Sequence, residues 1–251
     1  MKLRNHHVLI FGGGSGIGRA IAQKFLQNGA TVTIAGRRES VLLQTKQELD
    51  SDRLFYRVFD IADIPHHAAL FADCAKEMGG LTAFVNAAAL GSDQVSDRGY
   101  EPWDVTEAEW DLMTKVNYKA AFFLMRNEVD YLKAHGIRGN ILNIASNAAC
   151  MDIVGCYGAS KLSIIKWTRA LGKRYGQDGI ILNGIAPGAT VTPMIASYAK
   201  SEDQPYPRHA IGRFLRAEEI AQLAFYLMSD YGEIICGHTV IADGGDKNAT
   251  L

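Results

Sequence analysis

The chain has 251 residues, of which 48% are hydrophobic and 21% charged, so it can bury a full core and is not of the disordered class. Lys and Arg number 26 and Asp and Glu 27, a formal net charge of −1, which favours neither nucleic acid nor an anionic membrane surface as a partner. No zinc-finger spacing, bilayer-spanning apolar run or signal peptide is recognisable, so we expect a cytoplasmic protein with reduced thiols and no metal.

Short apolar runs alternate with amphipathic helical stretches along the whole chain. The predicted strands are 8–11, 31–35, 53–59, 81–85, 140–145, 180–185 and 239–242. The predicted helices are 16–28, 39–50, 65–78, 107–135, 157–175 and 217–228. Strands that are apolar throughout are typical of a parallel sheet covered on both faces. Because no linker or repeat divides the sequence, we predict one doubly wound α/β domain over residues 1–251, with seven strands and helices on both faces.

A glycine-rich segment from Gly12 to Gly18 follows the first strand and opens the first helix. Glycine lets the backbone turn sharply and approach a pyrophosphate, while the N–H groups at the start of the helix face the phosphates. The segment therefore predicts a dinucleotide site. A tight turn without a ligand is the alternative, and the position between strand and helix disfavours it.

The choice of dinucleotide depends on the end of the second strand. About twenty residues after the glycine-rich turn, an NAD site carries an acid for the ribose hydroxyls, but this chain has Gly36 followed by Arg37 and Arg38. Guanidinium groups suit a ribose phosphate, so NADP(H) is favoured over NAD(H). Alternatively, both arginines are solvated and pair with acids such as Glu39. Asp60, after the third strand, either accepts from the adenine amine or caps the next helix.

Tyr157 and Lys161 are four positions apart, so they share one face of a helix. A neighbouring ammonium and a nicotinamide cation would both lower the pKa of the phenol, which could then exchange a proton with a substrate oxygen. Ser146 ends the fifth strand, at the sheet edge where such folds bind ligands. Asn117 lies within a long apolar helix and is either a satisfied structural amide or part of a polar relay.

Together these features resemble the short-chain dehydrogenase/reductase family, in its compact single-domain branch, over essentially the whole chain. The residues that carry the resemblance are the turn from Gly12 to Gly18, Asp60, Asn86, Asn117, Ser146, Tyr157, Lys161, Asn183, Pro187, Gly188, Thr192, Asp243, Gly244 and Gly245. The resemblance implies a Rossmann fold and an oxidoreductase that transfers a hydride between a nicotinamide and a carbonyl or secondary alcohol.

The resemblance also implies roles for individual residues. Tyr157 would be the general acid or base, Ser146 would position the substrate oxygen, Lys161 would hold the nicotinamide ribose, and Asn117 would hold a water that links Lys161 to solvent. Thr190 and Thr192 would meet the carboxamide. The residues expected to bind the cofactor are Gly12, Gly14, Ser15, Gly16, Ile17, Gly18, Arg37, Arg38, Asp60, Ile61, Asn86, Ala87, Ala88, Tyr157, Lys161, Pro187, Gly188, Thr190 and Thr192.

The chain departs from the family pattern at three places. Phe11 replaces a threonine and Ala87 an asparagine that contact each other in the family, so we interpret the pair as a coupled exchange of a polar contact for an apolar one. Ala89 replaces a glycine and could crowd the ribose side of the cofactor. Ser146 and Tyr157 are eleven positions apart, which is tighter than the family spacing and predicts an altered substrate pocket.

The substrate side is described less fully by the sequence. The irregular segment 193–214 is expected to be a substrate lid, with a surface excursion as the alternative. The polar insertion 91–104 would lie near the mouth of the site. The pairs His6-His7 and His66-His67 lack metal-ligand spacing and are expected at the surface. The residues expected to line the pocket are Cys150, Met151, Val154, Cys156 and Met194.

We therefore predict an NADP(H)-dependent carbonyl reductase or alcohol dehydrogenase that acts on a small molecule. The alternatives are an NAD(H)-dependent alcohol or sugar dehydrogenase of the same family, and a catalytically silent nucleotide-binding sensor or scaffold. The helix from Ser160 to Tyr175 carries apolar side chains such as Leu162 and Trp167 beyond what one sheet contact needs. Because family members assemble through such helices, we expect a homo-oligomer, a tetramer or a dimer.

Overall fold

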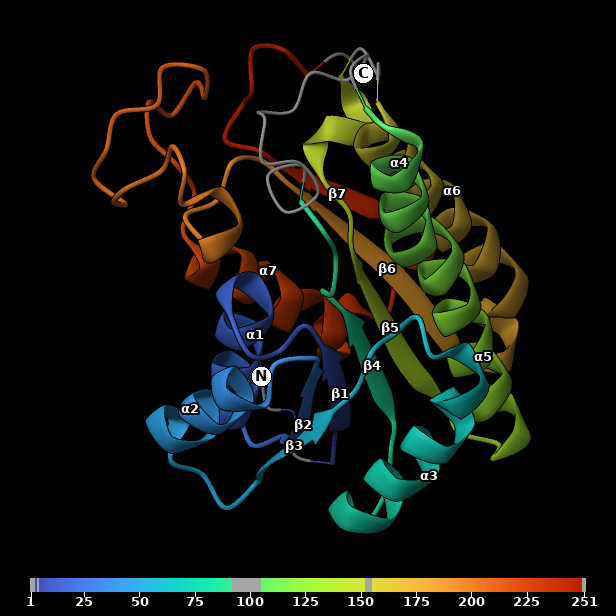
Figure 1. Ribbon diagram of the computed structural model, residues 1–251. Coiled ribbons are helices and arrows are strands. Elements are labelled where there is room, and N and C mark those ends of the chain that lie inside the picture. Colours follow the sequence, from blue (N-terminus) through green and yellow to red (C-terminus); the bar gives the residue numbers. More distant parts are fainter. Residues whose placement is uncertain (1–2, 4, 92–104, 152–154, 250–251) are drawn as a thin grey trace.

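The computed structural model describes residues 3, 5–91, 105–151 and 155–249. Its strands form one parallel sheet in the order β3-β2-β1-β4-β5-β6-β7 (Figure 1). The strands are β1 (His7–Phe11), β2 (Thr31–Gly36), β3 (Leu54–Val58), β4 (Ala83–Asn86), β5 (Gly139–Ile144), β6 (Ile180–Pro187) and β7 (Thr239–Ala242). The α-helices are α1 (Gly16–Gln27), α2 (Glu39–Leu49), α3 (His67–Met78), α4 (Glu107–Thr114), α5 (Ala121–Ala134), α6 (Cys156–Tyr175) and α7 (Ala217–Met228). The predicted single-domain fold is confirmed, and the element bounds agree closely with those read from the sequence.

The strand order reverses between β1 and β4, at the centre of the sheet. From β1 the chain proceeds outward through β2 and β3, and it then returns to place β4 on the other side of β1. A parallel sheet of this kind binds its ligands beyond the carboxyl ends of the strands, at the point of reversal. The glycine-rich turn after β1 lies there.

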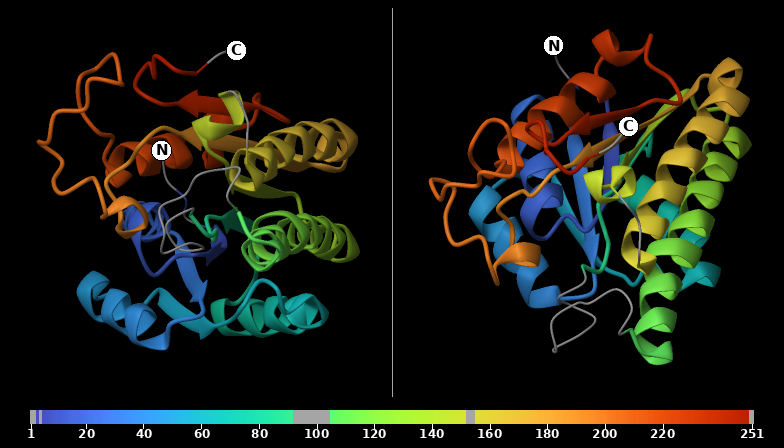
Figure 2. Two further views of the ribbon diagram at one scale, coloured as in Figure 1. Left: turned by 45° about the horizontal axis from the view of Figure 1, so that its top comes forward. Right: turned by 90° about the horizontal axis from the view of Figure 1, so that it is seen from above.

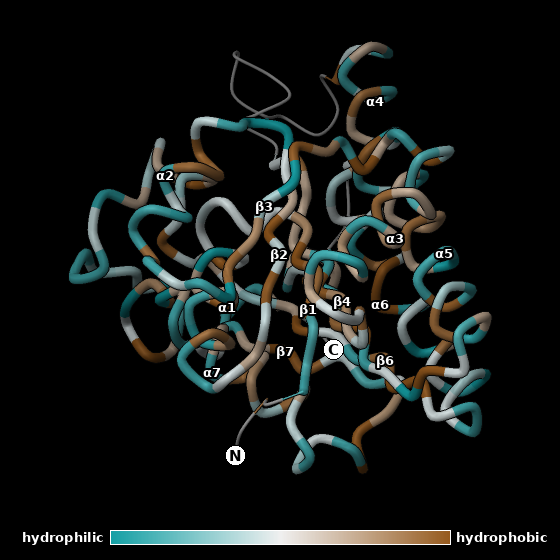
Figure 3. The backbone as a smooth tube through the Cα atoms, turned by 90° about the horizontal axis from the view of Figure 1, so that it is seen from below, coloured by the Kyte–Doolittle hydropathy of each residue, from teal (hydrophilic) through white to brown (hydrophobic). Residues whose placement is uncertain are grey.

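One face of the sheet is covered by α1, α2 and α7, which lie on the left in Figure 1. Ile21 and Phe25, four positions apart on α1, are both fully buried, as are Ile220 and Ala224 at the same spacing on α7. Figure 3 shows hydrophobic residues following the strands through the centre, with hydrophilic ones concentrated in the outer turns. The central strands therefore have no solvent-facing side, which explains their unbroken apolar sequences.

The other face is covered by α3, α5 and α6, which Figure 2 draws in teal, green and gold on the side away from α2. In Figure 1, α4 lies above α5. Its core contains an aromatic group in which the ring of Phe71 lies 5.0 Å from that of Phe84 and 5.7 Å from that of Tyr131, centroid to centroid. Phe11 joins this group, 6.4 Å from Phe71. Ala87 packs in the cluster on the opposite face. The side chains of Phe11 and Ala87 therefore lie in different clusters, whereas the two residues still meet through the backbone, where the N–H of Ala87 donates to the carbonyl oxygen of Phe11 at 3.0 Å.

The expectation that both histidine pairs lie at the surface was wrong for His67. Its side chain is fully buried and stacks on Phe71 at 6.2 Å between centroids. Its Nε2 lies 2.9 Å from the Ile61 carbonyl oxygen and its Nδ1 lies 3.1 Å from Asn127. These two partners satisfy the ring nitrogens, and burial lowers the pKa of His67, so the neutral imidazole can serve as a core residue.

The helical stretch expected over 107–135 consists of α4, a π-helical segment η3 (Lys115–Ala120), and α5. The π-helical turns add room inside the helix, a feature that is frequent at functional sites. Asn117 lies in this segment and is 3% exposed, so its amide needs partners within the protein. Within the described ranges, no helix is long and apolar enough to cross a membrane.

Candidate active site

The turn between β1 and α1 is built from glycines that could not be replaced without a steric conflict. Gly12 has a φ of +76°, and a Cβ there would lie 2.7 Å from the backbone nitrogen of Ala88. A Cβ on Gly13 would lie 2.5 Å from the side chain of Ile34, and one on Gly18 would overlap the carbonyl of Gly12. The turn therefore packs tightly against both neighbouring strands and the first turn of α1, which brings the helix start close to the ends of the strands.

The first turn of α1 keeps its backbone donors available. Ser15 is the N-cap residue but makes no side-chain capping hydrogen bond, and no acidic residue lies in the first turn. Such a helix start favours an anion, because its N–H groups lack partners within the helix. A Cβ on Gly16 would lie 3.0 Å from the Thr192 side chain, so the segment after β6 lies against this helix start.

A cavity of about 540 Å³ lies beyond the carboxyl ends of the strands. Nearly all sequence-predicted site residues line it, from both halves of the chain. Those that do are Gly12, Gly14, Ser15, Gly16, Ile17, Gly18, Arg37, Arg38, Asp60, Ile61, Ala87, Ala88, Ser146, Tyr157, Lys161, Pro187, Gly188, Thr190 and Thr192. Asn86 and Asn117 line a second, smaller cavity instead. Among the described residues, no cluster of three or more His, Cys, Asp or Glu side chains is arranged to hold a metal ion.

Three polar side chains converge on one wall of the large cavity. Ser146 follows β5, and its Oγ accepts a hydrogen bond of 3.1 Å from the backbone of Ala148. Tyr157 and Lys161 come from the first turns of α6. The Nζ of Lys161 donates to the carbonyl oxygen of Ile144 at 3.1 Å and lies 5.8 Å from the centre of the Tyr157 ring. The predicted sharing of one helix face thus brings the phenol and the ammonium together beside the strand end.

Burial is the main influence on the ionisation of these groups. It raises the pKa of Tyr157, and a hydrogen bond with Ser146 lowers it only in part. Burial also lowers the pKa of Lys161 to about 8, because the interior disfavours the ammonium. The lower pKa that we expect for Tyr157 from Lys161 and a nicotinamide cation together stays a prediction, because in the protein alone desolvation of the phenolate outweighs the hydrogen bond with Ser146.

The smaller cavity lies behind Lys161 and has a volume of about 20 Å³. Its polar lining includes Asn86, Asn117 and Asn143. Asn117 Oδ1 accepts from the backbone N–H of Leu90 at 2.8 Å, and its Nδ2 donates to the Leu90 carbonyl oxygen at 2.8 Å. Both interpretations of Asn117, a satisfied structural amide and a member of a polar relay, are therefore supported. Its amide is satisfied by Leu90 after β4, and it also borders a polar cavity next to Lys161.

A buried polar network continues from this cavity into the core. Asn86 Nδ2 donates to Asn143 at 2.8 Å and to Oε2 of Glu128 at 3.0 Å, while Asn143 Nδ2 donates to Thr168 at 2.9 Å. Glu128 is completely buried, and burial raises its pKa well above the ordinary value. Its Oε1 has no hydrogen-bond partner among the described residues. No pattern in the sequence indicated that Glu128 would be buried.

The basic pair after β2 borders the opposite end of the large cavity. Arg37 and Arg38 are both exposed, and no ion pair joins either of them to a described acid. Glu39 instead lies 3.4 Å from the hydroxyl of Tyr56. Asp60 accepts from the backbone of Ala62 at 2.9 Å, which is a local turn contact, and it also lines the cavity. The pairing of the arginines with Glu39 is therefore not seen.

The expected pocket walls are present only in part. Met151 and Met194 line the large cavity, whereas Cys150 and Cys156 do not, and Cys156 belongs to the core on the α6 side. Expecting the two cysteines in the pocket was wrong: Cys150 ends the 3-10 turn Asn147–Cys150 outside the cavity lining, and Cys156 is buried in the hydrophobic core. Val154 and positions 92–104 of the polar insertion lie outside the described residues.

Several cavity residues were not identified from the sequence. The segment 193–214 contributes Tyr198, Tyr206 and Arg208, and the chain after β7 contributes Asp246. Asn147, next to Ser146, completes this group. The only available signal was the concentration of tyrosine and arginine in the irregular segment. Which of these side chains would face the cavity depends on loop packing, which has no periodicity to read.

Comparison with known proteins agrees with this geometry. A family model described as Enoyl-(Acyl carrier protein) reductase matches residues 12–246. A 2,5-dichloro-2,5-cyclohexadiene-1,4-diol dehydrogenase of Sphingobium indicum is 30% identical over 244 residues, covering 95% of each chain. A 3alpha-hydroxysteroid dehydrogenase of Mediterraneibacter gnavus is 29% identical, covering 99% of each chain.

A solved structure gives the corresponding likeness in three dimensions. The 3-ketoacyl-(acyl-carrier-protein) reductase from Brucella melitensis, complexed with NADH, superposes with a TM-score of 0.86 at 26% identity. The match covers 97% of this chain and 99% of the other. The names of the three relatives refer to a cyclohexadiene diol, a hydroxysteroid and a 3-ketoacyl group on an acyl carrier protein, so they agree on alcohol and carbonyl chemistry and not on a substrate.

Proposed function

Because this chain belongs to the short-chain dehydrogenase/reductase family, an oxidoreductase family acting on CH–OH and C=O groups with a nicotinamide cofactor, we propose that it is an NADP(H)-dependent enzyme with Tyr157 as general acid or base. One observation carries the proposal. Ser146, Tyr157 and Lys161 line the same cavity as the glycine-rich turn and the arginines after β2, so a dinucleotide bound along the turn could bring its reactive end to the phenol.

The residues present fit such a cofactor. The glycines between Gly12 and Gly18 pack against neighbouring protein atoms and carry no side chains that would cover the backbone, and the start of α1 supplies donors for a pyrophosphate. Residues near Pro187 and Thr190 border the other end of the cavity, after β6. Lys161 is a donor suited to the hydroxyls of a ribose, and Asp60 an acceptor suited to an adenine amine.

In our proposal the chain controls the proton and the orientation of the substrate. When bound, the nicotinamide supplies or accepts the hydride. Ser146 donates a hydrogen bond to the substrate oxygen and holds it next to the phenol. The Tyr157 hydroxyl gives its proton to that oxygen during reduction and takes it back during oxidation. In the protein alone, burial raises the pKa of Tyr157, so the phenol carries its proton at neutral pH.

The small cavity behind Lys161 supports a role in resupplying that proton. Its volume of about 20 Å³ is enough for one water, and its asparagine lining offers donors and acceptors to hold it. We infer that such a water connects Lys161 to the chain around Asn117. Since the pKa of Lys161 is about 8, its ammonium can release a proton near physiological pH and regain it.

The preference for NADP(H) rests on Arg37 and Arg38. Both guanidiniums border the cavity, and neither is committed to a described carboxylate. A ribose phosphate would give them a partner of opposite charge. NAD(H) is the alternative cofactor, and it is supported by the structure of the Brucella melitensis reductase, which is complexed with NADH. A catalytically silent sensor is the alternative of another class, and the complete set of Ser146, Tyr157 and Lys161 argues against it.

Two further parts of the proposal concern the surroundings of the site. Met194, Tyr198 and Tyr206 line the cavity from segment 193–214, which supports its role as a substrate lid.

Tyr118 and Phe122 are exposed large hydrophobics that contact the ring of Trp167, at 4.8 Å and 5.1 Å between centroids. This aromatic surface on η3, α5 and α6 supports assembly into a dimer or tetramer. The cytoplasmic location remains a prediction from the sequence.

The test is cofactor-dependent turnover of a panel of ketones, aldehydes and secondary alcohols, followed at the nicotinamide absorbance with both cofactors. Tyr157→Phe keeps the ring and removes the transferable proton, so turnover should fall by about 10²- to 10⁴-fold while cofactor affinity changes little. Tyr226→Phe, an exposed tyrosine on α7, serves as the control and should retain full activity. If Tyr157→Phe keeps more than about a tenth of the activity, another group is the principal acid or base.

A further inference from the structure

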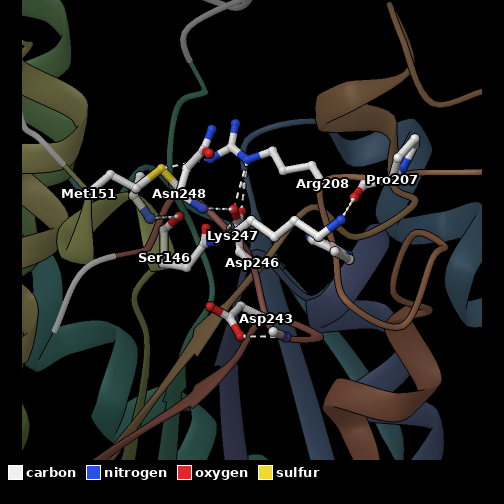
Figure 4. Close-up of polar contacts among 12 residues, drawn as sticks. Ser146, Met151, Pro207, Arg208, Asp243, Asp246, Lys247 and Asn248 are labelled. Carbon is white, nitrogen blue, oxygen red and sulfur yellow. Dashed lines mark hydrogen bonds and ion pairs between the residues drawn. The ribbon is translucent and has the colours of Figure 1, made fainter.

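One guanidinium lies in the wall of the catalytic cavity on the side of segment 193–214. Arg208 lines the same cavity as Ser146 and Tyr157, and its side chain is 35% exposed. Its Nε donates to both carboxylate oxygens of Asp246, at 2.8 Å and 3.0 Å. Figure 4 shows the guanidinium above Asp246, on the same side of the site as Ser146. Arg208 is therefore held at the cavity by a defined ion pair.

Asp246 is built as a fixed support for this arginine. Its side chain is 2% exposed, and it also accepts from Asn147 Nδ2 at 2.9 Å and from the backbone of Asn248 at 3.0 Å. Burial alone would raise the pKa of Asp246, but the hydrogen bonds from Arg208 and these neighbours outweigh burial and lower it. The carboxylate thus stays charged, and its oxygens are filled by donors from the protein.

The guanidinium, by contrast, keeps donors that the described residues do not use. Asp246 engages only the Nε edge, although Arg carries five N–H donors in a planar fork. Nη2 lies 2.8 Å from the sulfur of Met151, a weak acceptor, and no described residue accepts from Nη1. The pair Nη1 and Nη2 forms an edge of arginine that can bind a carboxylate with two parallel hydrogen bonds.

The charges that line the cavity leave room for an anionic substrate. The described basic side chains of the lining are Arg37, Arg38, Lys161 and Arg208, and the acidic ones are Asp60 and Asp246. Asp60 borders the cavity near the arginines after β2, and Asp246 is already paired. On the side of Ser146, the described lining therefore offers a carboxylate the oriented guanidinium of Arg208 in addition to Lys161, and no unpaired acid to repel it.

We propose that Arg208 is a substrate-binding residue that receives a carboxylate on the carbonyl or alcohol substrate through Nη1 and Nη2, with Asp246 and Asn147 as positioning residues. This inference rests on the proposed function, because it concerns the same cavity. It identifies the substrate class as oxo acids or hydroxy acids whose carboxylate lies some distance from the reacting carbon. A purely structural role, tying segment 193–214 to the chain after β7, is the competing explanation that the experiment must separate.

The experiment uses a graded series of probes: pyruvate, 3-oxobutanoate, 4-oxopentanoate and 5-oxohexanoate, each with its methyl ester. The full-length protein loaded with NADP+, which cannot reduce a ketone, is titrated with each probe by calorimetry, and kcat and KM are measured in parallel with NADPH. At one chain length the acid should bind at least about tenfold tighter than its ester, the effect of one charge-assisted contact. Arg208→Met should remove that preference by raising the KM for the acid, while the KM for the ester stays unchanged. Arg208→Lys should keep part of the preference.

The control variant is Arg216→Met. Arg216 pairs with Glu202 at 3.1 Å and does not line the cavity, so losing its guanidinium changes the net charge equally but should leave the acid-to-ester ratio as in wild type. An absence of acid preference at every chain length overturns the inference, as does an Arg208→Met variant in which acid and ester affinities fall together. Failure of the proposed function is seen separately, as turnover that Tyr157→Phe does not diminish or as a protein that binds neither nicotinamide cofactor.

Discussion

The buried carboxyl of Glu128 predicts an unusual pH dependence of stability. Its side chain has no exposed surface, Oε2 accepts only from Asn86 at 3.0 Å, and Oε1 has no partner among the described residues. Because burial holds its pKa well above the ordinary value, Glu128 is a neutral acid in the folded protein over a range of pH in which the unfolded chain is ionised. The substitution to test is Glu128→Gln, which keeps the shape and the acceptor for Asn86.

The sign follows from proton linkage. Above the unfolded-state pKa the folded protein binds one proton more than the unfolded chain, so wild-type stability falls as pH rises towards the folded-state pKa. Each pH unit in that window costs about 1.4 kcal/mol. Glutamine does not titrate, so the free energy of unfolding of Glu128→Gln relative to wild type should rise by about 1 kcal/mol between pH 5 and pH 6.

The assay is urea unfolding of both proteins at pH 5 and pH 6, at one fixed protein concentration so that any assembly contributes equally. Other titrating groups are common to both proteins and cancel in the difference. Glu233→Gln, at an exposed site on the chain before β7, reports the effect of losing a carboxylate at the surface. A relative stability of Glu128→Gln that stays constant or falls with pH would refute the reasoning.

Three further predictions concern the cofactor, the buried lysine and assembly. NADPH should bind at least about tenfold tighter than NADH by calorimetry; Arg37→Ala should remove most of this preference, and Gly36→Asp, whose Cβ would meet only Leu42 at 3.7 Å, should shift it towards NADH. Equal or tighter binding of NADH by wild type would contradict this assignment. Since burial lowers the pKa of Lys161 to about 8, the unfolded chain binds more protons above that pH, and the stability gained by Lys161→Met in urea unfolding should shrink between pH 8 and pH 10. Light scattering at micromolar protein should give the mass of a dimer or tetramer, and a monomer would contradict the oligomer.

Much of the fold could be predicted because its signals are local. Continuous apolar strands, amphipathic helices and a glycine-rich turn each depend on short stretches of chain, and the parallel order follows from their alternation. The positions of Ser146 and Tyr157 were predictable for the same reason, since a strand end and a helix start meet at one sheet edge.

The remainder depends on contacts that no local pattern encodes. His67 and Glu128 can be buried because polar partners on other elements, Asn127 and Asn86, form hydrogen bonds with their side chains. The pKa shifts that burial causes at Tyr157 and Lys161 were not predictable either, because the cost of burying each charged form depends on the packing around it. The ion pair between Arg208 and Asp246 could not be predicted because it joins two irregular segments, whose packing has no periodic sequence pattern.

The meeting of β1 and β4 at the centre of the sheet also has an evolutionary consequence. Segments before β4 supply the wall that contains Arg37 and Asp60, whereas segments after β5 supply the wall that contains Ser146 and Arg208. Substitutions at well-separated positions act almost additively, so the two walls can diversify independently. A lineage with this fold could change its nicotinamide cofactor or its substrate by separate mutations. Recombination between β4 and β5 would exchange the specificity for one of them and keep the specificity for the other.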